Sequence, residues 1–147
     1  MKQTAAFLLV LALLFSASTG DARNTVHQLS VGAALAEGEA KGVLIDSIAL
    51  YFGDQATPAV EQSHGQFTAN RKTNAFNKSD EEACNWVFLT AIKALQDRAR
   101  AQGGNAVINI YSYYYKNEFV SETEFECGAG AMVAGVTMIG DVVTIAE

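Results

Sequence analysis

The sequence predicts an α+β fold: an antiparallel-rich sheet of four or five strands with one long helix packed on one face. Three observations lead to this prediction. One stretch has the apolar period and capping residues of a long helix, and several others alternate as strands do. The two cysteines lie in these two kinds of segment, so a bridge between them would join helix and sheet.

Residues 1–22 have the pattern of a secretory signal peptide. Lys2 is followed by the apolar run AAFLLVLALLF and then by small residues. Cleavage is expected after Ala17, Gly20 or Ala22, and we favour Ala22. The run is shorter than the roughly 20 residues of a membrane span, and no cysteine at the junction could carry a lipid. We therefore expect an exported single domain at 23–147, located in the periplasm, with no membrane anchor after cleavage.

The segments before the long helix carry weaker patterns. A strand at 46–52 (DSIALYF) is the clearest, because alternate residues are apolar and Gly53-Asp54 ends it. The other expected elements are a strand or extended lead-in at 23–29, a short Ala-rich helix at 31–40, a polar loop at 54–64 and a strand at 66–73.

The long helix is expected at 80–102. Ser79-Asp80-Glu81-Glu82 has the form of a capping box, and its acids suit the positive end of the helix dipole. The helical projection places Cys84 near the middle of the apolar face, toward the sheet. Trp86 and Leu89 fall on the polar side. Either the N-terminal half covers them, as we expect, or they form a contact surface.

The segment 105–115 (NAVINIYSYYY) is rich in strand formers. Alternation would place Ala106, Ile108 and Ile110 on one face, and Tyr111, Tyr113 and Tyr115 on the other. Such a tyrosine stripe either packs against another layer or binds a flat ligand or a partner. Trp86 and these three tyrosines are therefore the candidate contact surface.

The segment 121–127 (SETEFEC) also alternates, which aligns Glu122, Glu124 and Glu126 on one face and Cys127 on the other. A carboxylate row either keeps a sheet edge soluble or attracts a divalent cation or a basic partner. The small-residue segment 128–135 and the segment 141–145 supply the remaining strands.

Two cysteines in an exported protein predict a disulfide, here Cys84–Cys127. The rival interpretation is a reactive or metal-bound pair. The pair lacks CxxC spacing, and only His27 and His64 could assist it. Cys127 shares its strand face with Phe125, away from the glutamates, so a helix packed on that face would bring the sulfurs together.

Composition and motifs reduce the number of functional classes that the sequence favours. A net charge of −6 without a basic run argues against nucleic acid as a partner. No nucleophile–base motif is present, so we expect no enzyme and no cofactor. Two hypotheses remain. One is a periplasmic binding or interaction module for an envelope protein or a small ligand. The other is a metal-handling protein that uses Glu122, Glu124 and Glu126 with a histidine.

The C-terminal half resembles two families through the runs LQDRARAQGGNAVIN and CGAGAMVAGVTM. One family is described as heavy-metal-binding, and the other is the domain of the Rcs envelope-stress sensor. The second resemblance implies a periplasmic module braced by disulfides. This chain departs from the sensor by lacking its lipid-bearing cysteine and two of its domain cysteines.

The whole chain resembles a family of small exported proteins of Gram-negative bacteria, through YFG, KTNAFNKSDEEACNWVFL, ALQDRA, GGNAV and SETEFECGAGAM. Many members carry an excinuclease label, which implies an excinuclease-related role. The chain has neither the phosphate-binding G-x-x-x-x-G-K-[ST] loop nor the zinc-finger cysteines that such a role suggests.

Overall fold

The computed structural model describes residues 22–147, so the predicted signal peptide lies outside the described residues except for Ala22. The described chain forms an α+β fold with a six-stranded, mostly antiparallel sheet, one strand more than the upper expectation. In chain order the elements are β1 (Thr25–Ser30), α1 (Val31–Ala40), β2 (Ala49–Phe52), β3 (Val60–Asn74), α2 (Asp80–Ala101), β4 (Ala106–Ser112), the 3₁₀ turn η1 (Tyr114–Lys116), β5 (Glu124–Ala129) and β6 (Val133–Ile145).

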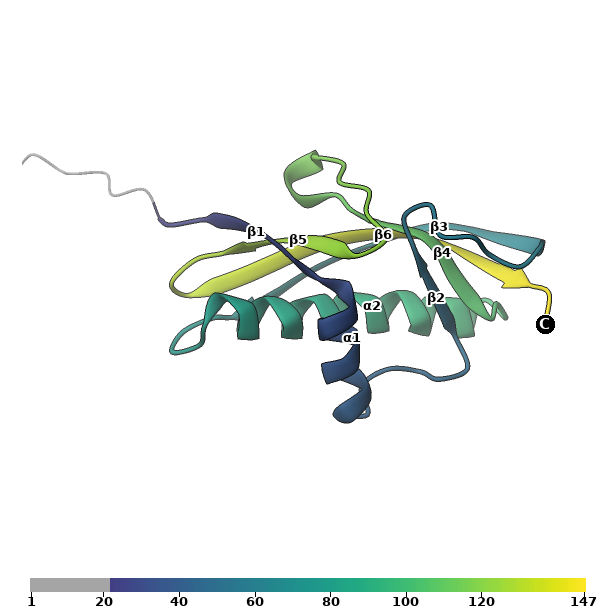
Figure 1. Ribbon diagram of the computed structural model, residues 1–147, viewed down its shortest axis with the longest axis horizontal. Coiled ribbons are helices and arrows are strands. Elements are labelled where there is room, and N and C mark those ends of the chain that lie inside the picture. The colour runs from purple at the N-terminus through teal and green to yellow at the C-terminus, as the bar shows by residue number, and fades with distance from the viewer. Residues whose placement is uncertain (1–21) are drawn as a thin grey trace, which may run out of the picture.

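The sheet is organised around β6. Antiparallel β3 follows one side of β6 along its whole length, from the pair Asn74–Val133 to the pair Val60–Ile145. On the other side, β5 pairs with the first part of β6 and β4 with the second part. β1 then extends the sheet from β5, and β2 extends it from β4 as the one parallel pair among the described strands (Figure 1).

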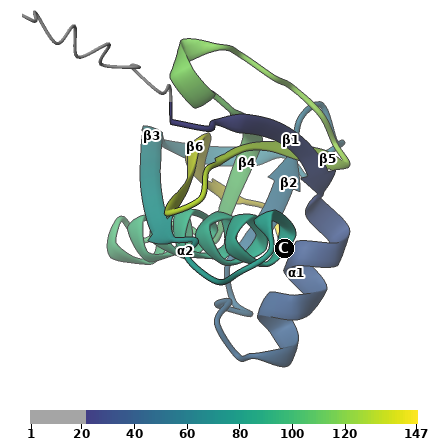
Figure 2. The same ribbon diagram turned by 90° about the vertical axis from the view of Figure 1, so that its left-hand side faces the viewer.

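The helix α2 covers one face of this sheet, which we call the inner face (Figures 1 and 2). Ser79 caps its start, since the Ser79 hydroxyl oxygen accepts a hydrogen bond of 3.0 Å from the backbone N–H of Glu82. Gly103 follows the helix with a φ of +79°, a conformation that glycine adopts cheaply. Of the apolar side chains on the predicted face, Ala94 is partly buried and the others are buried: Ala83, Cys84, Val87, Phe88, Ala91, Ile92 and Leu95. Full burial of one large apolar side chain contributes about 1.5–3 kcal/mol.

The disulfide prediction is confirmed. Cys84 of α2 and Cys127 of β5 are bonded, their Cα atoms lie 5.8 Å apart, and neither side chain is exposed. The bridge spans a sequence separation of 43 residues. By the loop-entropy argument such a bridge stabilises the fold by about 4 kcal/mol. It fixes the start of α2 to the inner face.

The short helix α1 packs against part of α2, away from the sheet (Figure 2). Gly38 permits this approach, because a Cβ there would lie 2.5 Å from Leu89 Cδ2. Leu89 is fully buried, as predicted, whereas Trp86 stays 39% exposed with the Lys41 ammonium 5.6 Å from its ring centroid. Covering by the N-terminal half is thus confirmed for Leu89 and holds only in part for Trp86.

Several sequence predictions are wrong in position. The strands expected at 128–135 and 141–145 are the end of β5, a turn and one continuous β6. The polar loop expected at 54–64 becomes strand from Val60, because β6 supplies it with backbone partners. The strand expected to reach Tyr115 ends at Ser112. Within that strand, Asn109 has a φ of +51° and the register shifts, so the alternation breaks. Ile108 therefore joins a small cluster with Val143 and Ile145, whereas Ile110 enters the main core.

Candidate ligand groove

An open groove of about 940 Å³ lies on the outer face of the sheet, opposite α2. The loop that carries η1 rises over this face (Figure 2). We call it the tyrosine groove. Its lining comes from residues 22–24, from Asn70 and Lys72 of β3, from residues 113–116 around η1, from Gly128 of β5, from the turn at 130–132, and from Val133, Gly135 and Thr137 of β6.

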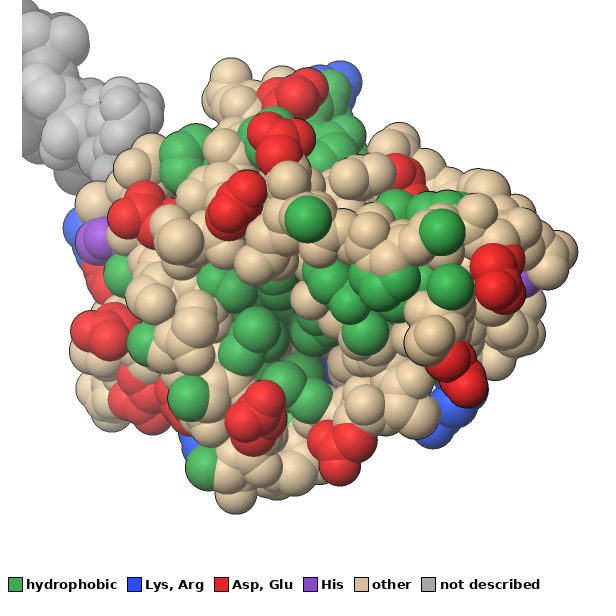
Figure 3. All heavy atoms as spheres, turned by 45° about the vertical axis from the view of Figure 1, so that its right-hand side comes forward, with side chains coloured by type: hydrophobic (Ala, Val, Ile, Leu, Met, Phe, Trp, Pro, Cys, Tyr) green, Lys and Arg blue, Asp and Glu red, His purple; other side chains and the backbone are tan. Residues whose placement is uncertain are grey.

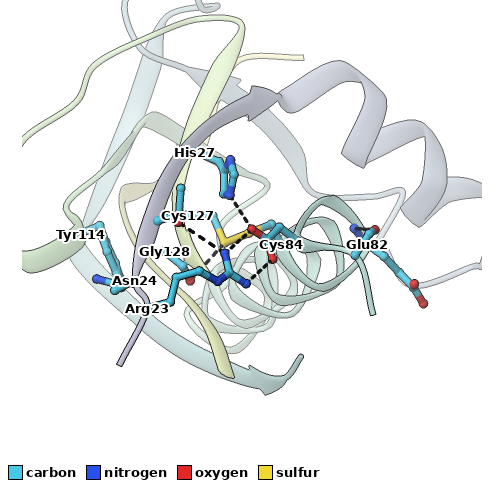
Figure 4. Close-up of polar contacts among 11 residues, drawn as sticks. Arg23, Asn24, His27, Glu82, Cys84, Tyr114, Cys127 and Gly128 are labelled. Atoms are coloured by element: carbon cyan, nitrogen blue, oxygen red, sulfur yellow. Dashed lines mark hydrogen bonds and ion pairs between the residues drawn. A yellow bond between two sulfur atoms is a disulfide. The ribbon is translucent and has the colours of Figure 1, made fainter. Parts of the chain in front are cut away.

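Tyr114 contacts two of the other segments that line the groove. Its ring lies directly over Gly128, where an added Cβ would come within 1.9 Å of the phenol oxygen. Its hydroxyl donates a hydrogen bond of 3.1 Å to Asn24 Oδ1 (Figure 4). Partial burial is the main reason that the pKa of Tyr114 is raised. One side chain thus joins η1, β5 and the segment before β1, and only glycine at 128 leaves room for it.

The turn beside Tyr114 is strained. Tyr115 and Lys116 follow one another in the left-handed region, with φ values of +49° and +62°. For a residue other than glycine, this conformation costs about 1–2 kcal/mol. The turn exposes 72% of Tyr115, whose ring centroid lies 4.5 Å from that of Tyr114. Strain of this kind is concentrated at binding and catalytic sites, so the turn marks this wall as a candidate site.

The charge of the groove is opposite to that of the chain. Arg23, Lys72 and Lys116 line it, and no Asp or Glu is among its lining residues, although the chain has a net charge of −6. Within residues 22–147, neither lysine takes part in an ion pair. On the face drawn in Figure 3, by contrast, acidic side chains surround the hydrophobic ones and basic side chains are few. The groove is therefore a local positive site on an acidic protein.

One lip of the groove is fixed by an ion cluster at the start of α2. Arg23 donates two hydrogen bonds to the Asp80 carboxylate, at 2.8 and 3.0 Å, and His27 Nε2 lies 2.8 Å from the same carboxylate. Figure 4 shows Arg23 and His27 turned toward the helix start beside Cys84. The hydrogen bond from Arg23, and then that from His27, hold the pKa of Asp80 well below its usual range. The cluster ties the segment before β1 to α2.

The predicted contact residues are only partly brought together. Tyr113 and Tyr115 line the groove, whereas Tyr111 lies outside it, edge-on to Tyr113 with ring centroids 6.4 Å apart. Trp86 lies on α2 and is not in the groove. The single-face stripe is wrong because the strand ends at Ser112 and the chain turns into η1.

The sequence interpretation did not identify Tyr114, Lys72, Lys116 or Met132 as site residues, although all four line the groove. No local pattern could have placed all four together, because they come from three segments: β3, η1 and the turn between β5 and β6. The pairing of Lys72 with Gly135 across β3 and β6 is what places this lysine at the groove. The unbroken run of three tyrosines before Lys116 was the one sequence feature that pointed here.

The glutamate row does not form as predicted. Glu122 precedes β5, so only Glu124 and Glu126 lie on the strand. On one side, β1 pairs with β5 from Thr25 to Ser30, and on the other side β6 pairs only with Gly128 and Ala129 of β5. The histidines lie elsewhere: His27 contacts Asp80, and His64 Nε2 lies 2.9 Å from the Thr144 hydroxyl. Between residues 22 and 147, no group of three His, Cys, Asp or Glu side chains is placed to hold a metal ion.

Comparison with known proteins finds no matching family model, no matching curated protein and no matching solved structure. The family resemblances of the sequence therefore stay predictions. In the part of the chain that the structure describes, no helix combines the length and apolar character needed to cross a membrane.

Proposed function

We propose that this protein is an exported, non-catalytic binding module of the bacterial envelope, which holds a small ligand in the tyrosine groove. The observation that carries the proposal is the groove itself. It has an apolar wall, formed by a strained tyrosine turn and the seat of Tyr114 on Gly128. Its volume of about 940 Å³ suits a small molecule, since such sites are concave, mostly apolar and about 300–1,000 Å³ in size.

Export to the periplasm is supported by two features. The signal-peptide pattern at 1–22 is one. The other is the Cys84–Cys127 disulfide, a bond that persists in oxidising compartments. Export would be tested by sequencing the N-terminus of the mature protein. The expected start lies between Thr19 and Asn24, and a retained Met1 in envelope fractions would contradict it.

A binding role, rather than a catalytic one, is supported by the lining of the groove. Its side chains include no His, Cys, Ser, Asp or Glu, so it lacks the residues that most often form a pair of nucleophile and general base. Its polar groups are amides, phenols, one threonine and three cations. These groups suit recognition through hydrogen bonds and charge.

The binding proposal is tested with N-phenyl-1-naphthylamine, a neutral aromatic probe whose fluorescence rises in an apolar site. We expect a fluorescence increase, with amide chemical-shift changes at residues 113–116 and 128–137. Tyr115→Ala should weaken binding severalfold, because this exposed ring gives the wall much of its apolar area. Phe76→Ala is the matched control, since Phe76 is an exposed aromatic outside the lining. No binding, or shift changes confined to other surfaces, would overturn the proposal.

A further inference from the structure

We propose that the ligand of the tyrosine groove is a small amphiphilic anion: an aromatic or aliphatic body that carries one carboxylate, sulfonate or phosphate group. This inference rests on the proposed binding function and names the chemical class of the ligand. The body would lie against the tyrosine wall, and the acidic group would lie near Lys72 and Lys116.

The apolar part of the ligand follows from the exposed side chains of the groove. Tyr115 is 72% exposed, Met132 59% and Val133 50%, and all three line the groove. They come from η1, from the β5–β6 turn and from β6, so a ligand in the groove would remove apolar surface of three separate segments from water. That burial is the driving force for an apolar body.

The acidic group follows from the lysines. Elsewhere in the described chain, Lys41 and Lys93 each pair with a carboxylate four residues away on the same helix or its cap. Lys72 and Lys116 form no ion pair among the described residues, and no acidic side chain lines the groove between them. Arg23 is already engaged by Asp80. The two lysines are therefore the cations available to an anionic group of a ligand.

A free small molecule is favoured over a lipid surface by the shape of the site. The anchored segment 22–24 and the η1 turn both take part in the lining, so the apolar side chains surround a hollow between them. A side chain that inserts into a bilayer would instead have to project from a free tip.

The test compares two probes that share one skeleton. 8-Anilinonaphthalene-1-sulfonate and N-phenyl-1-naphthylamine differ only by the sulfonate. At physiological ionic strength, we expect the sulfonate to bind about tenfold more tightly. The double variant Lys72→Gln/Lys116→Gln should reduce this preference to about twofold, because the two positive charges that would face the sulfonate are lost.

The controls separate charge from folding. Lys78→Gln removes a lysine that lies outside the lining and should keep the full preference. Circular dichroism and thermal unfolding of each variant test whether it is folded. They exclude the case in which 8-anilinonaphthalene-1-sulfonate binds apolar surface exposed by a loosened fold. Gln retains the β-carbon of Lys116, so the left-handed backbone there carries the same strain in both chains.

Each outcome decides one claim. Equal binding of the two probes, or a preference that survives the double variant, would overturn the anionic class while leaving the binding function in place. If neither probe binds the wild-type protein, the binding function itself is overturned. Co-sedimentation with phosphatidylglycerol vesicles that depends on Lys72 and Lys116 would overturn the free molecule in favour of a membrane surface. No sedimentation, together with sulfonate preference, supports the proposal.

Discussion

The inner face of the sheet buries its apolar side chains, whereas the outer face leaves several of them exposed. On the inner face, the rings of Phe88 and Phe125 stack with centroids 4.0 Å apart, beside the Cys84–Cys127 disulfide, and all of these side chains are buried. On the outer face, Tyr115 and Met132 are largely exposed beside a strained turn. The difference teaches that stability and recognition are separated here. A braced inner face lets the outer face carry strain and open apolar surface.

The groove on the outer face is shaped by special backbone positions, whereas the inner face is shaped by side-chain packing. Residues of the inner face are held by close packing with α2, which any apolar pattern of the right period can supply. In the described chain the outer face carries no α-helix, only the short 3₁₀ turn η1. Its groove depends instead on single special positions, such as Gly128 beneath Tyr114 and the left-handed Lys116.

The largest effect is expected from the inner face. The double variant Cys84→Ala/Cys127→Ala should lower the free energy of unfolding by about 4 kcal/mol, because it releases the loop between the two residues. Chemical denaturation of the oxidised wild type and the variant measures this change. Below the transition, probe binding in the groove should stay near the wild-type value. A variant that is fully stable but has lost binding would contradict the separation of the two faces.

A medium effect is expected at the seat of Tyr114. Gly128→Ala forces the ring off β5 and should cost about 2 kcal/mol, as overpacking does. It should also reduce probe affinity in the groove, so this one position couples both faces. Gly32→Ala in α1 is the control, since an added Cβ there meets nothing closer than 3.8 Å and should be neutral or slightly stabilising. If Gly128→Ala leaves the probe affinity unchanged, the ring of Tyr114 does not form a wall of the binding site.

The smallest effect is expected at the ion cluster. Asp80→Asn should lower the free energy of unfolding by about 1 kcal/mol at neutral pH, a figure reduced for partial solvent exposure. Because the folded-state pKa of Asp80 is lowered, its contribution is complete above the ordinary Asp pKa of about 3.9 and is lost as pH falls below it. Denaturation curves of both chains should therefore converge in acid. A difference that grows as pH falls would reverse this assignment.

One residue of α2, Gln96, shows where helical projection stops being informative. The projection places Gln96 on the polar side, yet it is only 1% exposed. Its amide donates to the carbonyls of Ile45 and Ile48, at 3.1 and 2.9 Å, and accepts from the Ile45 N–H at 2.8 Å. The loop after α1 supplies these partners, so a polar residue is buried without an unpaired group. Only the tertiary arrangement brings that loop to the helix.

The sequence by itself determined the elements that depend on local patterns. The Ser79 cap, the apolar face of α2 and the placement of Cys84 and Cys127 on facing surfaces were sufficient to predict the helix, the α+β class and the disulfide. The helix α1 at 31–40 also followed from the sequence. These features need only neighbours within a few residues, or one covalent bond, to be recognised.

The tertiary structure alone decided the sheet and the groove. Polar β3 became a long strand because β6 offers it backbone hydrogen bonds, and β4, bulged at Asn109, ended at Ser112 before it reached Tyr113 and Tyr115. The groove then joined residues 24, 72, 114 and 128, which come from four separate segments of the chain. Strand pairing and close contacts between backbone and ring are long-range interactions, so no local period encodes which residues they bring together.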